Sequence, residues 1–222
     1  MTSTTKKNTI HALSRLGETK EVMSYMNSTD GQEVDAHDLF QTTPLVWGAR
    51  NGHDETVKYL SSIKADVNAT GFGGWSALQH AVSCSCETMV TLLLRHDANP
   101  NASDETGTRA LHVAAARGAI NIVARLIESH ADVNAQNAAG MRPLHYGALF
   151  GHVSSLKTLA EHGADINAQD TDGNTALHLA AQMGFENAVQ FLLSVCNKRI
   201  VNKEGKLPLN MAQSSLIRNL LK

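Results

Sequence analysis

Leucine recurs along this chain at a nearly constant interval. Consecutive members of the series stand 33 residues apart, except for the last, which follows after 32: Leu45, Leu78, Leu111, Leu144, Leu177 and Leu209. Each begins a short segment of apolar and small residues, and a second apolar segment with helical spacing follows it, as at 122–127 and 188–193. One such unit cannot bury its apolar face alone. A constant period of this length therefore predicts stacked helix-turn-helix units, an all-α solenoid.

The most regular copy of the unit runs from Gly173 to Gly184. Gly173 can adopt a positive φ in a turn, and Thr175 can cap the helix that follows. Gly184 can end that helix in the left-handed conformation. At the corresponding helix start other copies carry Pro44 or Pro143, where a helix tolerates proline. These residues predict a turn, a first helix and a second helix in each unit.

The repeats also divide the chain into segments. We expect a flexible polar tail over residues 1–9 and a single repeat domain over 10–222. Within that domain we place a degenerate N-terminal repeat at 10–37, five repeats at 38–70, 71–103, 104–136, 137–169 and 170–201, and a C-terminal cap at 202–222. Lys64, Asp97 and His130 occupy the place that Gly163 holds in the fourth full repeat. A left-handed backbone there costs each of them about 1 kcal/mol relative to glycine.

Two short motifs accompany the leucines. The first is Thr-Pro-Leu at Thr43 or Thr-Ala-Leu-His at Thr175, and the second is the hairpin Ala-Asp-Val-Asn at 65–68 and 131–134, with Ala-Asp-Ile-Asn at 164–167. In these motifs the chain resembles the ankyrin-repeat family, over roughly residues 10–222. The resemblance implies an ankyrin-repeat solenoid with β-hairpin-like loops and a function in protein–protein interaction. It also implies hydroxylation of Asn134 or Asn167, a modification known for the family.

The histidine of the motif recurs at His112, His145 and His178. The resemblance implies that it makes structural hydrogen bonds between repeats, rather than ligating a metal. The first two full repeats depart from the pattern, with Val46 and Gln79 at the histidine position. The second also has Ser85 where most copies have the glycine that ends the first helix.

Charge and composition limit the classes of partner that we expect. The formal charge of −2 and the pI near 6.6 provide no global field for nucleic acid or an anionic membrane, so we expect neither. We find no apolar signal segment, no run as long as a membrane span and no disulfide framework among three cysteines. We therefore expect a cytoplasmic or nuclear monomer. The end of the chain from residue 194 is basic, which we interpret as cap solubility, with a docking site for an acidic partner as the alternative.

Candidate chemistry is sparse. His80, Cys84 and Cys86 are the one cluster that resembles a ligand set, but a zinc site usually needs four ligands at recognisable spacing. We find no nucleophile–base pair and no phosphate-binding loop in the sequence. We expect no enzyme, no cofactor and no metal. A metal-binding or catalytic protein that uses this cluster is the remote alternative.

The leading hypothesis is a non-enzymatic scaffold or adaptor. In the ankyrin family partners bind the concave face, made by hairpin tips and first-helix ends. Carried over to this chain, those places give the candidate protein-binding residues Phe40, Arg50, Phe72, Trp75, Arg117, Met141, Leu149, Phe150 and Met183. The alternative is a regulatory subunit or inhibitor of an enzyme, or a protein like the proteasome-assembly chaperone gankyrin, to which the architecture is similar.

Overall fold

The structure is a computed structural model that describes residues 9–222. The described chain forms two compact units, the first ending at Glu105 and the second beginning at Thr106. Of the expected tail, residues 1–8 lie outside the described residues. Thr9 is the N-cap of the first helix, where its hydroxyl accepts a hydrogen bond from the Ala12 amide.

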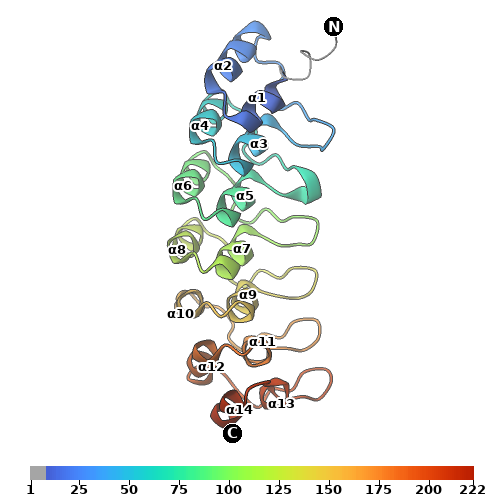
Figure 1. Cartoon of the computed structure of the whole chain (residues 1–222), viewed down its shortest axis with the longest axis vertical. Coiled ribbons are helices and arrows are strands. Elements are labelled where there is room, and N and C mark those ends of the chain that lie inside the picture. The colour runs from blue at the N-terminus through green and yellow to red at the C-terminus, as the bar shows by residue number, and fades with distance from the viewer. Residues whose placement is uncertain (1–8) are drawn as a thin grey trace. The chain divides into compact units, whose positions relative to one another are not determined.

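The first unit contains three helix pairs, each formed by a first and a second helix. The helices are α1 (Ile10–Leu16), α2 (Thr19–Ser28), α3 (Pro44–Arg50), α4 (Asp54–Ser62), α5 (Ala77–Ser83) and α6 (Glu87–Arg95), with a 3-10 turn η1 (Phe72–Gly74) before α5. Within this unit the first helices α1, α3 and α5 pack in sequence order, as do the second helices α2, α4 and α6 (Figure 1).

The second unit repeats this arrangement. Its helices are α7 (Ala110–Arg117), α8 (Ile120–Glu128), α9 (Pro143–Leu149), α10 (Val153–Glu161), α11 (Ala176–Met183), α12 (Glu186–Leu193), α13 (Pro208–Met211) and α14 (Ser215–Leu221). Here too the first helices form one layer and the second helices another (Figure 1). The predicted all-α helix-turn-helix fold is confirmed.

The recurring leucines form the core of both units. Leu45, Leu78, Leu111, Leu144 and Leu177 are buried, whereas Leu209, in the terminal pair, is only half-buried. Truncation of a buried leucine typically costs about 2–5 kcal/mol, so each copy adds a comparable share to stability. The period in the sequence therefore reflects the spacing of the packed core.

The ends of the helices follow the predicted chemistry. Gly118 and Gly184 end their helices at φ of 66° and 84°. Lys64, Asp97 and His130 adopt φ of 69°, 63° and 66°, at the place where Gly163 has 86°. These three non-glycine residues are therefore left-handed, the conformation that costs each of them about 1 kcal/mol relative to glycine.

Hairpin-like loops precede the first helices. Among residues 9–222 the structure contains no strand, and an isolated antiparallel bridge joins Thr70 and Ser76. In the second unit successive loops are linked by backbone hydrogen bonds: Ala138 N donates to Thr106 O at 2.8 Å, Thr171 N to Ala139 O at 3.0 Å and Lys203 N to Asp172 O at 2.9 Å. The loops of this unit are thus fixed to one another as well as to their helices.

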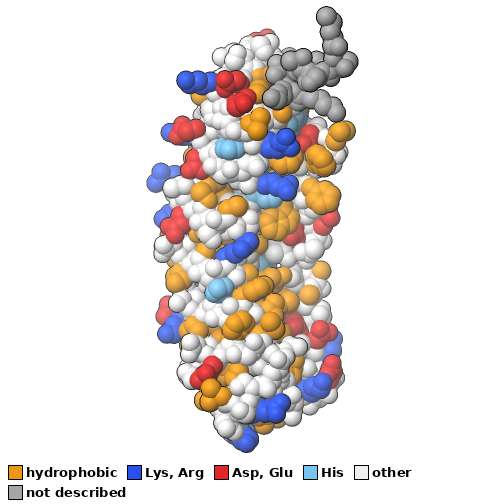
Figure 2. Space-filling model, viewed as in Figure 1, with side chains coloured by type: hydrophobic (Ala, Val, Ile, Leu, Met, Phe, Trp, Pro, Cys, Tyr) orange, Lys and Arg blue, Asp and Glu red, His pale blue; other side chains and the backbone are white. Residues whose placement is uncertain are grey.

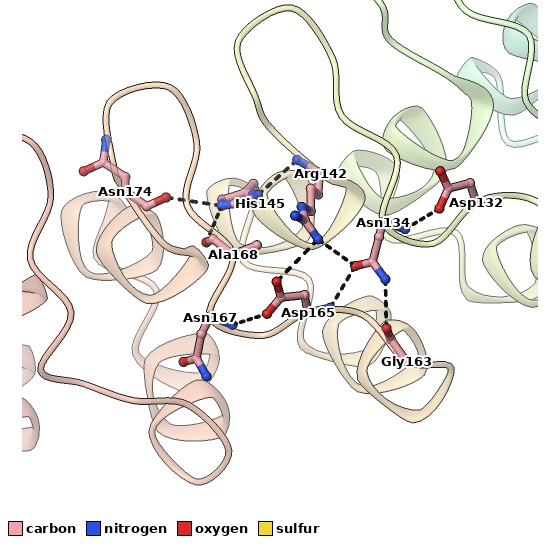
Figure 3. A network of polar contacts seen from close by, with 9 residues as sticks. All are labelled: Asp132, Asn134, Arg142, His145, Gly163, Asp165, Asn167, Ala168 and Asn174. Carbon is pink, nitrogen blue, oxygen red and sulfur yellow. Dashed lines mark hydrogen bonds and ion pairs between the residues drawn. The ribbon is translucent and has the colours of Figure 1, made fainter.

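A polar network joins neighbouring repeats below these loops (Figure 3). Asn134 Nδ2 donates to Gly163 O at 2.9 Å, while its Oδ1 accepts from Asp165 N at 2.8 Å and Arg142 Nη1 at 3.2 Å. Arg142 also forms an ion pair of 3.5 Å with Asp165. The asparagine of the hairpin motif therefore connects one repeat with the next.

The helices are short. In the part of the chain from residue 9 to residue 222, no helix has the length and apolar character needed to span a bilayer.

Candidate protein-binding surface

The motif histidines form hydrogen bonds with backbone groups. His145 Nδ1 accepts a hydrogen bond from Arg142 N at 3.0 Å, so the neutral ring carries its proton on Nε2, which donates to Ala168 O and Asn174 O (Figure 3). His112 and His178 make the same two kinds of bond, to Met141 O and Lys206 O respectively through Nε2. Burial lowers the pKa of His145 and of His178 and keeps both rings neutral. The predicted structural role is confirmed.

Gln79 takes over part of this role in the second full repeat. Its Oε1 accepts a hydrogen bond from Ser76 N at 3.0 Å, and Ser76 Oγ accepts one from Gln79 N at 3.2 Å. This reciprocal pair caps α5 as the histidine caps the corresponding helices. Glutamine in this repeat thus replaces the histidine as the residue that caps the start of the first helix.

Large apolar side chains are exposed on the loops of the first unit. Leu39 is 97% exposed, Phe72 76% and Phe40 59%. The loop before α3 has a defined shape, because Asp38 Oδ1 accepts hydrogen bonds from Phe40 N at 2.8 Å and Thr42 N at 3.0 Å. Leu39 and Phe40 therefore lie on an ordered loop, which reduces the conformational entropy lost on binding.

Beside that loop lies a cluster centred on Trp47. Its Nε1 donates to Asp38 Oδ2 at 2.7 Å, and the Phe40 ring meets it edge to face at 6.3 Å. The guanidinium carbons of Arg15 and Arg50 lie over the indole at 5.7 and 5.1 Å. Burial would raise the pKa of Asp38, but the hydrogen bonds from Trp47 and the loop amides outweigh it, so the pKa is lowered and the side chain is a carboxylate.

Trp75 is less free than its place on a hairpin suggests. It is half-buried, and its ring lies 5.1 Å from that of His80 in a tilted arrangement. Burial, with a smaller contribution from the charge of Arg50, lowers the pKa of His80 to about 4. Among the expected site residues of the first unit, Phe40, Arg50 and Phe72 are exposed and Trp75 is partly covered.

In the second unit the expected residues divide in the same way. Phe150 is 49% exposed and Met183 52%, and Arg117 is also exposed, each at the end of a first helix. Met141 and Leu149 are half-buried. Hydrophobic side chains gather over the first helices in the view of Figure 2, and much of the charge lies toward the second helices and the loop edge.

The cluster His80, Cys84 and Cys86 does not assemble as a ligand set. His80 is turned toward Trp75, Cys84 is exposed, and Cys86 Sγ lies 3.3 Å from Thr88 Oγ1. Over residues 9–222 no group of three His, Cys, Asp or Glu side chains is arranged to hold a metal ion.

The basic C-terminal end is partly used within the fold. Lys198 Nζ donates to Leu221 O at 3.3 Å and Arg218 Nε to Ala212 O at 2.9 Å, while Lys206 pairs with Glu204 at 2.6 Å. These contacts fit the terminal cap that the sequence predicts.

Comparison with known proteins decides the family. Profiles of ankyrin repeats match residues 10–104 and 92–170, described as three copies, and residues 150–193, described as many copies. The chain belongs to the ankyrin-repeat family. Ankyrin repeats are in general protein–protein interaction modules, typically without catalytic activity.

A solved structure agrees in fold. The ankyrin repeat domain of human ASB11 is similar to this ankyrin-repeat chain with a TM-score of 0.83 at 23% sequence identity, over 96% of each chain. That level of identity supports the fold alone. No curated protein sequence matches the chain.

Sequence reasoning missed part of this ankyrin surface. Arg15, Asp38 and Trp47 were not among the expected site residues, although with Phe40 and Arg50 they form a connected cluster at the surface of the first unit. The available signal was weak: Arg50 follows Trp47 by one helical turn, but Arg15 reaches the ring from another helix.

Proposed function

We propose that this ankyrin-repeat chain is a non-catalytic scaffold that binds a partner protein through its hairpin loops and first-helix ends. The observation that carries the proposal is the exposure of Leu39, Phe40 and Phe72 on loops held by hydrogen bonds. Large apolar side chains in such places add nothing to the core, whereas aromatic residues are enriched at the centres of protein interfaces.

The distribution of polar groups supports the same function. The motif histidines and Asn134 make hydrogen bonds that hold the repeats together, which gives them a structural role. The loops and first-helix ends instead expose large apolar side chains to solvent. In the second unit these are Phe150 and Met183.

The test is affinity purification with quantitative mass spectrometry, using the full chain as bait in an extract of its source cells. We compare the wild type with the triple variant L39S/F40S/F72S and with the double variant F150S/M183S. Matched controls are Met23→Ser on α2 and Ile120→Ser on α8, which also remove exposed apolar side chains but from second helices.

The proposal expects specific proteins that the wild type and both controls enrich and that at least one multiple variant loses, by about tenfold. Circular dichroism shows whether each variant is folded. Equal enrichment by the wild type and both folded multiple variants would contradict the proposal, as would the absence of any enriched protein.

A further inference from the structure

Two arginine side chains lie over one indole ring in the first unit. Arg15 stands in the last turn of α1, and Trp47 and Arg50 stand on α3, so the packing of α1 against α3 brings the three together. The guanidinium carbons are 5.7 and 5.1 Å from the ring centroid. A cation–π contact orients a guanidinium group but leaves its charge and most of its donors available.

Both arginines are exposed, and neither makes an ion pair with any residue in the range 9–222. The acid that reaches the ring, Asp38, uses Oδ1 for two loop amides and Oδ2 for Trp47. Two positive groups in fixed positions are therefore available to carboxylates from outside.

A depression lies beside these charges. It has a volume of about 570 Å³, and its walls include Arg15, Leu39, Phe40 and Trp47, together with Asp38, whose oxygens already accept the hydrogen bonds described above. Leu39, which is almost fully exposed, and Phe40, which is largely exposed, give it an apolar side. A volume of this size accommodates one or two large side chains of a bound segment.

We infer that this cluster binds a short acidic segment of a partner protein, in which a large apolar side chain is flanked by carboxylates. The apolar side chain would enter the depression beside Leu39 and Phe40, and the carboxylates would pair with Arg15 and Arg50. Arginine suits this task because its planar group pairs with a carboxylate through two parallel hydrogen bonds. The inference rests on the proposed function and names the partner class of one part of that surface.

The charge of the unit as a whole argues against nucleic acid at the same place. Residues 1–105 contain 8 Lys and Arg against 13 Asp and Glu, a formal charge of −5. A long polyanion would be repelled by most of this unit, and strong binding to nucleic acid needs several phosphate contacts rather than two. A short acidic peptide meets only the local positive charge, which lies beside the ring of Trp47 and near Leu39 and Phe40.

The experiment uses a random dodecapeptide library displayed on phage and selected on the full chain at low salt. Synthetic versions of the most enriched peptides are then titrated by fluorescence anisotropy into the wild type and the variant R15Q/R50Q. The matched control is Arg95→Gln, an exposed arginine of α6 in the same unit. Circular dichroism confirms that the variants are folded.

We expect the selection to enrich peptides with Asp or Glu next to Trp, Phe or Leu. R15Q/R50Q weakens their binding about tenfold, Arg95→Gln leaves it unchanged, and added salt reduces it. Enrichment of basic or uncharged peptides, equal binding to R15Q/R50Q, or no enrichment overturns the inference. Tight binding of single-stranded oligonucleotides that R15Q/R50Q abolishes would assign the cluster to nucleic acid instead.

Two further readouts separate the possible outcomes. If sedimentation velocity shows a wild-type dimer that R15Q/R50Q dissociates, the occupant is a second copy of this chain and the inference is wrong. If R15Q/R50Q still captures the proteins that L39S/F40S/F72S loses, protein binding stands while the acidic-segment inference fails.

Discussion

Asp38 connects its own loop with the indole of Trp47. One carboxylate oxygen accepts from Trp47 Nε1 at 2.7 Å, and the other accepts from the amides of Phe40 and Thr42. The exposed loop and the first-helix surface of α3 are therefore joined by a single side chain.

Substitution of Asp38 by alanine removes all three of these hydrogen bonds. We expect Asp38→Ala to lower the free energy of unfolding by about 2 kcal/mol, and Trp47→Phe, which removes one bond, by about 1 kcal/mol. Urea unfolding followed by circular dichroism measures both. Glu161→Ala, at an exposed acid of α10, is the control and should change little. Equal stability of Asp38→Ala and the wild type would show that the loop is held by other contacts.

Two glycines with the same backbone conformation should respond differently to alanine. Gly173 and Gly184 have φ of 78° and 84°, but a Cβ on Gly173 would lie 2.8 Å from Lys203 N, whereas one on Gly184 would meet nothing within 4 Å. Gly184→Ala should therefore cost only the left-handed strain, about 1 kcal/mol, and Gly173→Ala should cost clearly more because the loops must separate. Thermal unfolding of the two variants compares them directly, and equal losses would refute the close approach.

His145 satisfies backbone groups from two repeats. We expect His145→Leu to lower the free energy of unfolding by about 3 kcal/mol, since Arg142 N and the carbonyl groups of Ala168 and Asn174 lose a partner. His145→Gln should recover part of this loss, because Gln79 caps α5 in the equivalent place.

The control for His145 is His162→Leu, at an exposed ring whose Nδ1 forms a hydrogen bond with Thr158 O in the preceding turn. Its effect should stay within about 0.5 kcal/mol. The account of the histidines is wrong if His145→Leu is as stable as His162→Leu.

The half-buried ring of His80, whose pKa burial lowers, predicts a pH dependence of stability. The unfolded chain takes up a proton at this residue near pH 6.5, but the folded chain does so only near pH 4. Between these values the unfolded state binds more protons, so the free energy of unfolding is fully maintained above about pH 6.5 and falls as the pH falls toward 4. Over this interval the free energy of unfolding of His80→Gln should fall less than that of the wild type, by an amount on the order of 2 kcal/mol. Parallel pH profiles for the variant and the wild type would contradict the burial of this ring.

Much of the fold could be predicted from the sequence, because it depends on local and periodic signals. The spacing of Leu45 and Leu78 indicates which positions are buried, and the repeat register aligns Lys64 with Gly163, both of which adopt a left-handed backbone in the structure. Such features need only the repeat register and the chemistry of turns and caps.

The candidate surface could be predicted only in part. The register placed Phe72 and Trp75 on the same hairpin, but it did not show that Phe72 points to solvent while Trp75 folds against His80. The register also did not predict the contact between Arg15 and Trp47, because that contact depends on the side-chain directions of two helices. These relationships require three-dimensional coordinates.

The most direct test of protein binding is photo-cross-linking in an extract of the source cells. Benzoylphenylalanine replaces Phe72, which is 76% exposed on its loop, or in the matched control Met23, which is 39% exposed on the second helix α2. The account predicts that the probe at position 72 forms a discrete cross-linked band with a partner protein and that the probe at position 23 does not. Cross-linking at position 23 but not at 72, or at neither position, would contradict it.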